Sequence, residues 1–174
     1  VSFLFTMFSY GFIDPNLPLF SHPLLLTIQQ PLMYIVYQDR IWAFFTVLTF
    51  FIMNFIHYVV ALTTYSKRYS IKKIVILLII ASVPFIFSYP AFSYDLFNYI
   101  LTAKVVFVHK ENPYITMPIE IPKEPALAYT RASNKVALYG PTWIVATFIP
   151  HILGGSSVWG TILAFKIFNA GLFF

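Results

Sequence analysis

The stretch IWAFFTVLTFFIMNFIHYVVALTTY, residues 41–65, is the clearest indication of the fold class. It contains no Asp, Glu, Lys or Arg. A helix needs about 20 mostly apolar residues to cross the hydrocarbon core of a bilayer. Residues 41–65 are therefore predicted to form a membrane-spanning helix.

The whole chain has the composition of a membrane protein. Of its 174 residues, 59% are hydrophobic and 10% are charged, whereas soluble domains carry about 25% charged residues. The net charge of +5 comes from scattered cations beside apolar runs rather than from one basic face, so we exclude a nucleic-acid partner. The absence of cysteine excludes disulfides and thiol nucleophiles.

Other apolar runs extend this prediction to an all-α, polytopic protein, a single integral membrane domain over residues 1–174. The run 74–89 is a slightly short span, and Pro141 opens another. The runs at the two ends are interpreted as truncated spans, so we expect a fragment. The predicted spans, about five in number, are residues 1–13, 41–65, 74–89, 141–154 and 158–174.

The short segment SKRYSIKK, residues 66–73, predicts the orientation. It is basic and contains no acidic residue, and short basic loops stay in the cytoplasm. Residues 14–40 and 90–140 are then expected at the outer face. The prolines of residues 14–40 argue against one long regular helix and favour an interfacial or re-entrant piece.

The second outer segment is predicted to carry an amphipathic helix from Ser93 to about His109. At roughly 100° per residue, Asp95 and Tyr99 share one face, and Phe97 and Lys104 lie on the opposite one. We expect this helix along the bilayer surface with its apolar side toward lipid. Lys104 is then expected to extend its amine toward lipid phosphates.

Three short motifs follow one another in this segment. They are S-x-D-x-x-x-Y at residues 93–99, N-P-Y at 112–114 and Y-G-P-x-W at 139–143. Their order and spacing resemble the bacterial polyprenyl-phosphate-sugar-dependent glycosyltransferases of the GT-C fold class, especially the α-mannosyltransferase-like branch. The resemblance covers residues 93–143, and the flanking spans match in topology.

The resemblance implies an inverting hexosyltransferase, incomplete in this fragment, in a bacterial plasma membrane. Its donor is a polyprenyl-phosphate sugar such as mannose, and its acceptor is a glycan or lipid hydroxyl at the outer face. The motif aspartate, the general base of the family, is Asp95, and the motif tyrosine is Tyr99.

The chemistry of such a transfer needs one base near the acceptor hydroxyl and a positive charge near the departing phosphate. Asp14, in FIDPN on the same predicted face, is the rival base. We expect no metal and no cofactor other than the lipid-linked donor. Beside Tyr99, the predicted donor- or acceptor-binding residues are Arg131, Lys135, Lys104, Asn112, Tyr114 and Tyr139.

Two other classes of function stay open at this point. A transporter or flippase portion is disfavoured because the acidic residues lie in outer loops and no internal repeat is visible. A non-catalytic membrane subunit is expected to tolerate the loss of the Asp95 charge.

Overall fold

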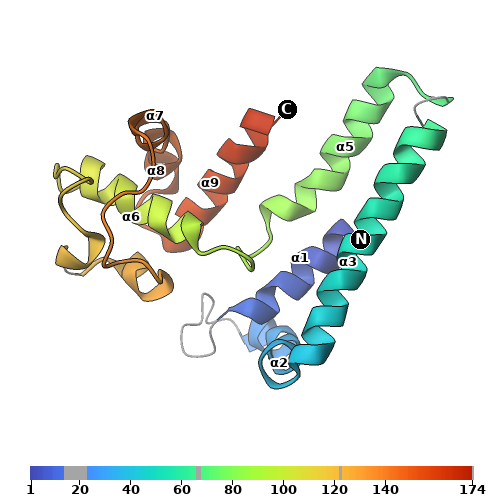
Figure 1. Cartoon of the computed structure of the whole chain (residues 1–174), viewed down its shortest axis with the longest axis horizontal. Helices are drawn as coiled ribbons and strands as arrows, with labels where there is room; N and C mark the ends of the chain where they lie inside the picture. The colour runs from blue at the N-terminus through green and yellow to red at the C-terminus, as the bar shows by residue number, and fades with distance from the viewer. Residues whose placement is uncertain (14–22, 66–67, 122, 174) are drawn as a thin grey trace. The chain divides into compact units, whose positions relative to one another are not determined.

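The computed structural model describes residues 1–13, 23–65, 68–121 and 123–173. These residues form helices and connecting segments, with no β-strand among them, as the all-α prediction requires. The chain divides into two compact units, Val1–Ala91 and Phe92–Phe174, shown in Figure 1.

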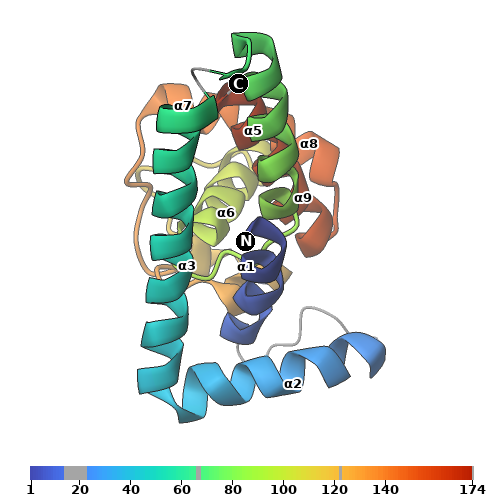
Figure 2. The same cartoon turned by 90° about the vertical axis from the view of Figure 1, so that its right-hand side faces the viewer.

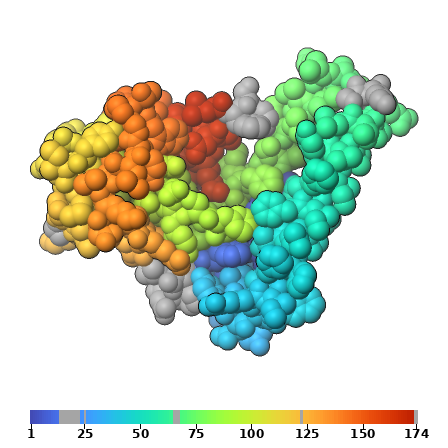
Figure 3. All heavy atoms as spheres, viewed as in Figure 1, coloured from blue at the N-terminus to red at the C-terminus, as the bar shows by residue number. Residues whose placement is uncertain are grey.

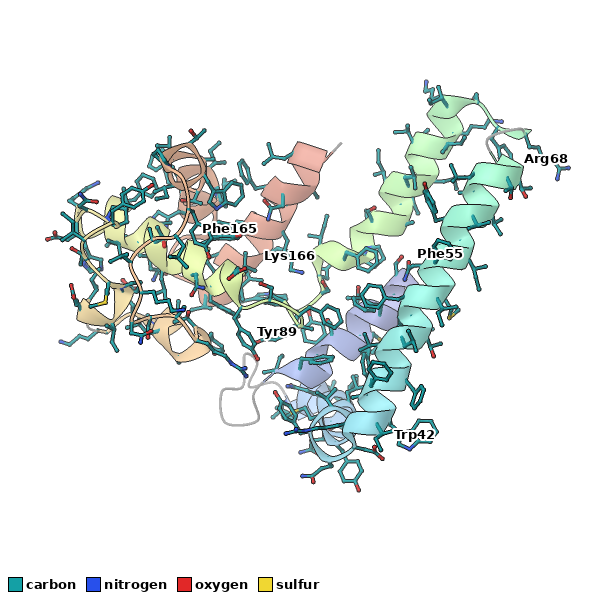
Figure 4. The ribbon with its side chains drawn as sticks, viewed as in Figure 1. Trp42, Phe55, Arg68, Tyr89, Phe165 and Lys166 are labelled. Atoms are coloured by element: carbon teal, nitrogen blue, oxygen red, sulfur yellow. The ribbon has the colours of Figure 1, made fainter. Side chains whose placement is uncertain are left out.

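Helix α3 dominates the first unit. It runs from Arg40 to Val60, begins at the capping residue Asp39, and continues as a π-helix over Ala61–Tyr65. The stretch Arg40–Thr64 has 25 residues and a mean hydropathy of 1.9, and it is the one helix in the described ranges long and apolar enough to cross a membrane. Figure 3 shows its surface, and Figure 4 labels its exposed rings Trp42 and Phe55. The helix predicted at residues 41–65 is thus present, with side chains suited to lipid.

Two shorter helices of the same unit contact each other. Helix α1 (Ser2–Ser9) continues into a 3-10 turn, η1 (Tyr10–Phe12), and contacts α5 (Ile71–Ile86), where Thr6 Oγ1 donates to the carbonyl of Pro84 at 2.8 Å. Compared with the predicted span 74–89, helix α5 begins three residues earlier and also ends three residues earlier. Its 16 residues rise about 24 Å, less than a typical hydrocarbon core.

Helix α2 (Pro23–Gln38) corrects one expectation. It is continuous over 16 residues with Pro31 inside it, so prolines do not interrupt this part of segment 14–40. Pro23 occupies the first position, where no hydrogen bond is lost, and Pro31 removes only one. Figure 2 shows α2 running crosswise to α3 at the N-terminal end of α3. Residues 14–22, including Asp14, lie outside the described ranges.

Helix α6 (Asp95–Phe107) forms the centre of the second unit. It is contacted by the short 3-10 segments η3 (Pro118–Glu120) and η4 (Pro125–Tyr129) and by the helices α7 (Pro141–Ala146), α8 (Phe148–Gly154) and α9 (Val158–Phe173). Phe97 is fully buried and stacks on Tyr129 with ring centroids 5.3 Å apart. The expectation that this apolar face lies toward lipid is therefore wrong, because protein covers it.

The predicted span 141–154 is divided into α7 (Pro141–Ala146) and α8 (Phe148–Gly154). The break lies at Thr147 because Pro150 offers no N–H to the carbonyl four residues earlier, and its ring crowds that carbonyl. Helix α9 (Val158–Phe173) follows the predicted turn. Gly154 lies so close to α9 that a Cβ atom there would stand 2.3 Å from the Cα of Thr161.

Candidate functional site

Asp95 is the first residue of α6 and its side chain is exposed. Its backbone N–H donates to Ser93 Oγ at 3.2 Å. The helix begins two residues later than predicted, with Tyr94 as its capping residue. The Oδ1 atom accepts long hydrogen bonds from Asn98 Nδ2 and Tyr139 OH, both at 3.5 Å. No salt bridge to Asp95 occurs among the described residues. Two neutral donors thus orient a carboxylate that no cation neutralises.

Asn98 connects this end of α6 to a distant segment. Its Nδ2 donates to Asp95, and its Oδ1 accepts from Thr130 Oγ1. Thr130 Oγ1 in turn accepts from the backbone N–H of Ala132 at 3.2 Å. Asn98 was not among the predicted site residues, although its position three residues after Asp95 places both on one helical face.

Arg131 is held against the ring of Tyr94, the residue before Asp95. Its guanidinium carbon lies 4.3 Å from the centroid of the Tyr94 ring, and Nη2 donates to Tyr94 OH at 3.3 Å. A cation over the face of a tyrosine ring is attracted by the ring quadrupole. Because Tyr94 directly precedes Asp95, the structure brings a positive charge to the end of α6 that carries the carboxylate.

A small cavity lies beside the two donors to Asp95. Its volume is about 20 Å³, and Asn98, Tyr139 and Lys135 are among its lining residues, with Thr102, Pro118, Ala132, Val136, Ala137 and Leu138. This volume is enough for one water molecule and too small for a sugar. A ligand larger than water can therefore reach Asp95 only from its exposed side.

Aromatic rings surround the same end of the helix. Tyr99 contacts Tyr139 and Trp143 edge-on, with ring centroids 4.6 and 5.2 Å apart. Burial and the charge of Asp95 raise the pKa of Tyr99. Burial also raises the pKa of Tyr139 to about 12; the Asp95 charge adds to this effect and a hydrogen bond with Asn98 opposes it. Both phenols are protonated at neutral pH, so they serve as hydrogen-bond donors and not as bases.

The N-P-Y motif holds the loop that carries Tyr139. Asn112 Oδ1 accepts from the backbone N–H of Tyr114 at 3.0 Å, and Tyr114 OH donates to the carbonyl of Tyr139 at 2.8 Å. The backbone N–H of Ala137 donates to the carbonyl of Pro113 at 2.8 Å. These contacts are within the protein, and a direct role of Asn112 or Tyr114 in ligand binding stays a prediction.

Lys104 lies about 13 Å further along α6 than Asp95. Its side chain is 12% exposed and forms a salt bridge with Glu124, which is 13% exposed and also contacts His109 Nε2 at 3.2 Å. The expectation that Lys104 extends toward lipid phosphates is therefore wrong. The Glu124 carboxylate pairs with the Lys104 amine inside the protein. The free-energy cost of burying this pair is lower than that of burying an isolated charge.

Comparison with known protein families identifies the chain. Residues 2–172 match the model of the MptA_B family, described as alpha-(1->6)-mannopyranosyltransferase, N-terminal domain. The chain belongs to this family. The mannosyltransferase resemblance inferred from the three motifs is confirmed at this level. Neither the curated proteins nor the solved structures contain a match to the chain.

In this member of a mannosyltransferase family, most of the predicted site residues meet at one end of α6. Asp95 lies there with Tyr99, Tyr139 and Arg131, and Lys135 lines the adjoining cavity. The rival base, Asp14, lies outside the described ranges. Within those ranges no group of three His, Asp or Glu residues could hold a metal; metal independence stays a prediction.

The Glu124 ion pair predicts a pH-dependent stability. Burial raises the pKa of Glu124, but hydrogen bonds from Lys104 and His109 and their charges outweigh it, so the pKa lies below its usual 4.5. A depressed carboxyl pKa stabilises the fold above pH 4.5, and this stabilisation is lost as pH falls through the folded-state pKa. At pH 7, we expect Glu124→Gln to lower the unfolding free energy by about 1–3 kcal/mol.

Thermal unfolding of the detergent-solubilised protein at several pH values measures this effect. The difference between wild type and Glu124→Gln should shrink as the pH is lowered below 4.5. Glu120→Gln, at an exposed glutamate of the same loop, is the matched control and should unfold like wild type. A Glu124→Gln defect of equal size at all pH values contradicts an ionic contribution.

Proposed function

We propose that the chain is part of an integral membrane α-(1→6)-mannosyltransferase of the GT-C class. It takes mannose from a polyprenyl-phosphate donor and transfers it to a hydroxyl of a glycan or lipid acceptor. The reaction takes place at the outer face of a bacterial plasma membrane. The observation that carries the proposal is the exposed Asp95 carboxylate, oriented by Asn98 and Tyr139, with Arg131 close by on Tyr94.

The proposed reaction is a single displacement. Asp95 takes the proton of the acceptor hydroxyl, whose oxygen attacks the anomeric carbon of mannose from the face opposite the phosphate. The bond between the anomeric carbon and the phosphate oxygen breaks, and its electron pair leaves with the polyprenyl phosphate. The configuration at the anomeric carbon inverts, so an α linkage requires a β-linked donor.

Cations and phenols complete this mechanism. Negative charge develops on the leaving phosphate in the transition state, where the Arg131 guanidinium can stabilise it with two parallel hydrogen bonds. Lys135, exposed beside the cavity, is the second phosphate-binding candidate. Tyr99 and Tyr139 keep their protons at neutral pH and can donate hydrogen bonds to sugar hydroxyls.

The proposed topology places α3 across the bilayer and the basic segment 66–73 in the cytoplasm. The other apolar helices are the further spans, and shorter ones are accommodated by local thinning of the bilayer. Lys72 and Lys73, in the first turn of α5, reach the inner interface by extending their side chains. Helix α2, which has no charged residue, lies along the outer interface.

An assay with two donors tests the donor class. Membranes containing the protein receive labelled polyprenyl-phosphate mannose or labelled GDP-mannose, together with a short α-(1→6)-linked mannose acceptor. We expect transfer from the lipid donor. Transfer from GDP-mannose in membranes stripped of polyprenyl phosphate contradicts the proposed donor. Labelled donor and unlabelled acceptor should give a product that an α-(1→6)-specific mannosidase degrades.

Replacing Arg131 tests the phosphate contact. We expect Arg131→Ala to raise the KM for the lipid donor about tenfold, because one charge-assisted contact is lost. Arg131→Lys should recover part of the loss, since it keeps the charge but not the planar fork. Lys110→Gln, an exposed cation of the same unit, should leave the KM unchanged. An unchanged KM together with an unchanged kcat in Arg131→Ala removes this residue from the site.

A further inference from the structure

Helix α2 presents three faces of different chemistry. One face packs against the 3-10 turn η1: Gln29 is buried, and the Leu32 carbonyl oxygen would lie 2.8 Å from a Cβ atom added to Gly11. A second face is apolar and exposed, with Leu24 at 69% and Ile28 at 48% exposure. This exposed apolar face suits insertion into the membrane interface.

The third face of α2 forms an open groove of about 250 Å³, lined by Gln30, Met33, Tyr34, Tyr37 and Gln38. Tyr34 is 67% exposed, so its ring face is accessible. Tyr37 OH donates to the carbonyl of Phe12 at 3.0 Å, and this hydrogen bond restrains the second ring. We call this surface the α2 groove.

The direction of the α2 groove follows from helix geometry. At roughly 100° per residue, the centre of the groove lies about 130° around the helix from the centre of the face of Leu24 and Ile28. When the face of Leu24 and Ile28 enters the membrane interface, the α2 groove therefore points away from the lipid. Its contents must be compatible with water.

The groove has the chemistry of a binding surface for neutral sugars. Helix α2 has no charged residue, which disfavours an ionic ligand. The amides of Gln30 and Gln38 both donate and accept hydrogen bonds, as sugar hydroxyls require. The negative faces of the Tyr34 and Tyr37 rings attract the C–H groups of a sugar ring, which carry a small positive charge.

We propose that the α2 groove binds an α-(1→6)-linked mannose residue of a glycan acceptor. This inference rests on the proposed function, which places α2 on the outer face and takes a glycan as one of its acceptors. A groove of this size holds about one sugar ring, so a single contact is weak.

Binding of a linear α-(1→6)-mannotetraose to the purified protein in detergent tests the proposal. Calorimetry or saturation-transfer NMR measures the affinity. We expect Tyr34→Ala to weaken binding five- to tenfold, because a ring contact is lost, and Tyr34→Phe to stay within twofold of wild type because the ring remains. Ile28→Ala, on the exposed apolar face of the same helix, is the matched control and should bind like wild type.

Transfer kinetics separate this inference from the proposed function. Tyr34→Ala should raise the KM for mannotetraose and leave kcat unchanged, because a binding contact is lost while the reacting groups are kept. Wild-type binding of mannotetraose through Tyr34 without any transfer overturns the proposed function but keeps the groove. Transfer that is indifferent to Tyr34→Ala overturns the groove alone. If Tyr34→Ala binds lipid vesicles less well and mannotetraose as well as wild type does, the α2 groove binds lipid. That result also overturns the proposed sugar binding.

Discussion

Replacing Asp95 with Asn should lower the rate of mannose transfer about a thousandfold, the usual contribution of a positioned general base. Asn has nearly the same shape and still accepts a hydrogen bond from Tyr139, but it cannot take the proton of the acceptor hydroxyl. The loss should appear in kcat more than in the KM for either substrate. Labelled-donor assays in membranes, with insertion checked by protease accessibility, measure the effect.

Asp39 supplies the matched control for this experiment. It also stands at the start of a helix, where its Oδ1 accepts from the backbone N–H of Trp42 at 3.2 Å, and Asn caps a helix about as well as Asp. Asp39→Asn should therefore keep full activity. The Asp14→Asn variant distinguishes the two candidate bases. If Asp14→Asn loses transfer while Asp95→Asn keeps it, Asp14 is the general base. If Asp95→Asn keeps its activity and only lowers the stability by about 0.3–1 kcal/mol, the role of Asp95 is to stabilise α6 through the interaction of its charge with the helix dipole.

Replacing Gly154 with Ala should be the most damaging single-methyl change to stability in the second unit. The new Cβ would stand 2.3 Å from the Cα of Thr161 and 2.7 Å from its backbone nitrogen. Backbone atoms of α9 cannot rotate away as a side chain can, so α8 and α9 must separate. Overpacking in a tight core costs about 1–3 kcal/mol, and a clash with backbone should reach at least the upper value.

Denaturation in increasing SDS, followed by circular dichroism and protease resistance, measures the loss. Gly171→Ala is the control, because a Cβ there meets nothing within 4 Å and alanine favours a helix over glycine by up to about 1 kcal/mol. We expect the control to be neutral or slightly more stable. Equal stability of Gly154→Ala and wild type contradicts the close contact between α8 and α9.

Helix α6 shows how far a local pattern reaches. Its position could be predicted because apolar residues recur at the helical period from Phe97 onward and an acidic residue opens the first turn. The same pattern could not show whether lipid or protein covers the apolar face, because lipid tails and apolar side chains are equally suitable contacts for it. The stacking of Phe97 on Tyr129, from a segment about thirty residues later, decides that protein covers it.

The charged partners of α6 show the same limit. Lys104 has the sequence context of a cation that extends toward lipid, yet the fold places Glu124 and His109 beside it. The residue pattern of α6 alone does not show which later loop packs against the helix. The Pro-rich segment 112–125 provides that return, and its path depends on contacts made across the unit.

The helix over residues 41–65 could be predicted from the amino-acid sequence because hydropathy and length are local properties. The order of the motifs indicated a mannosyltransferase, and the position of Asp95 at the start of a helix was also predictable. The groups that surround that carboxylate, in contrast, depend on the folding of the unit. Asn98, Thr130 and Tyr139 meet there through hydrogen bonds between distant segments. Such bonds form only after the intervening loop has closed, so their partners cannot be identified from local sequence.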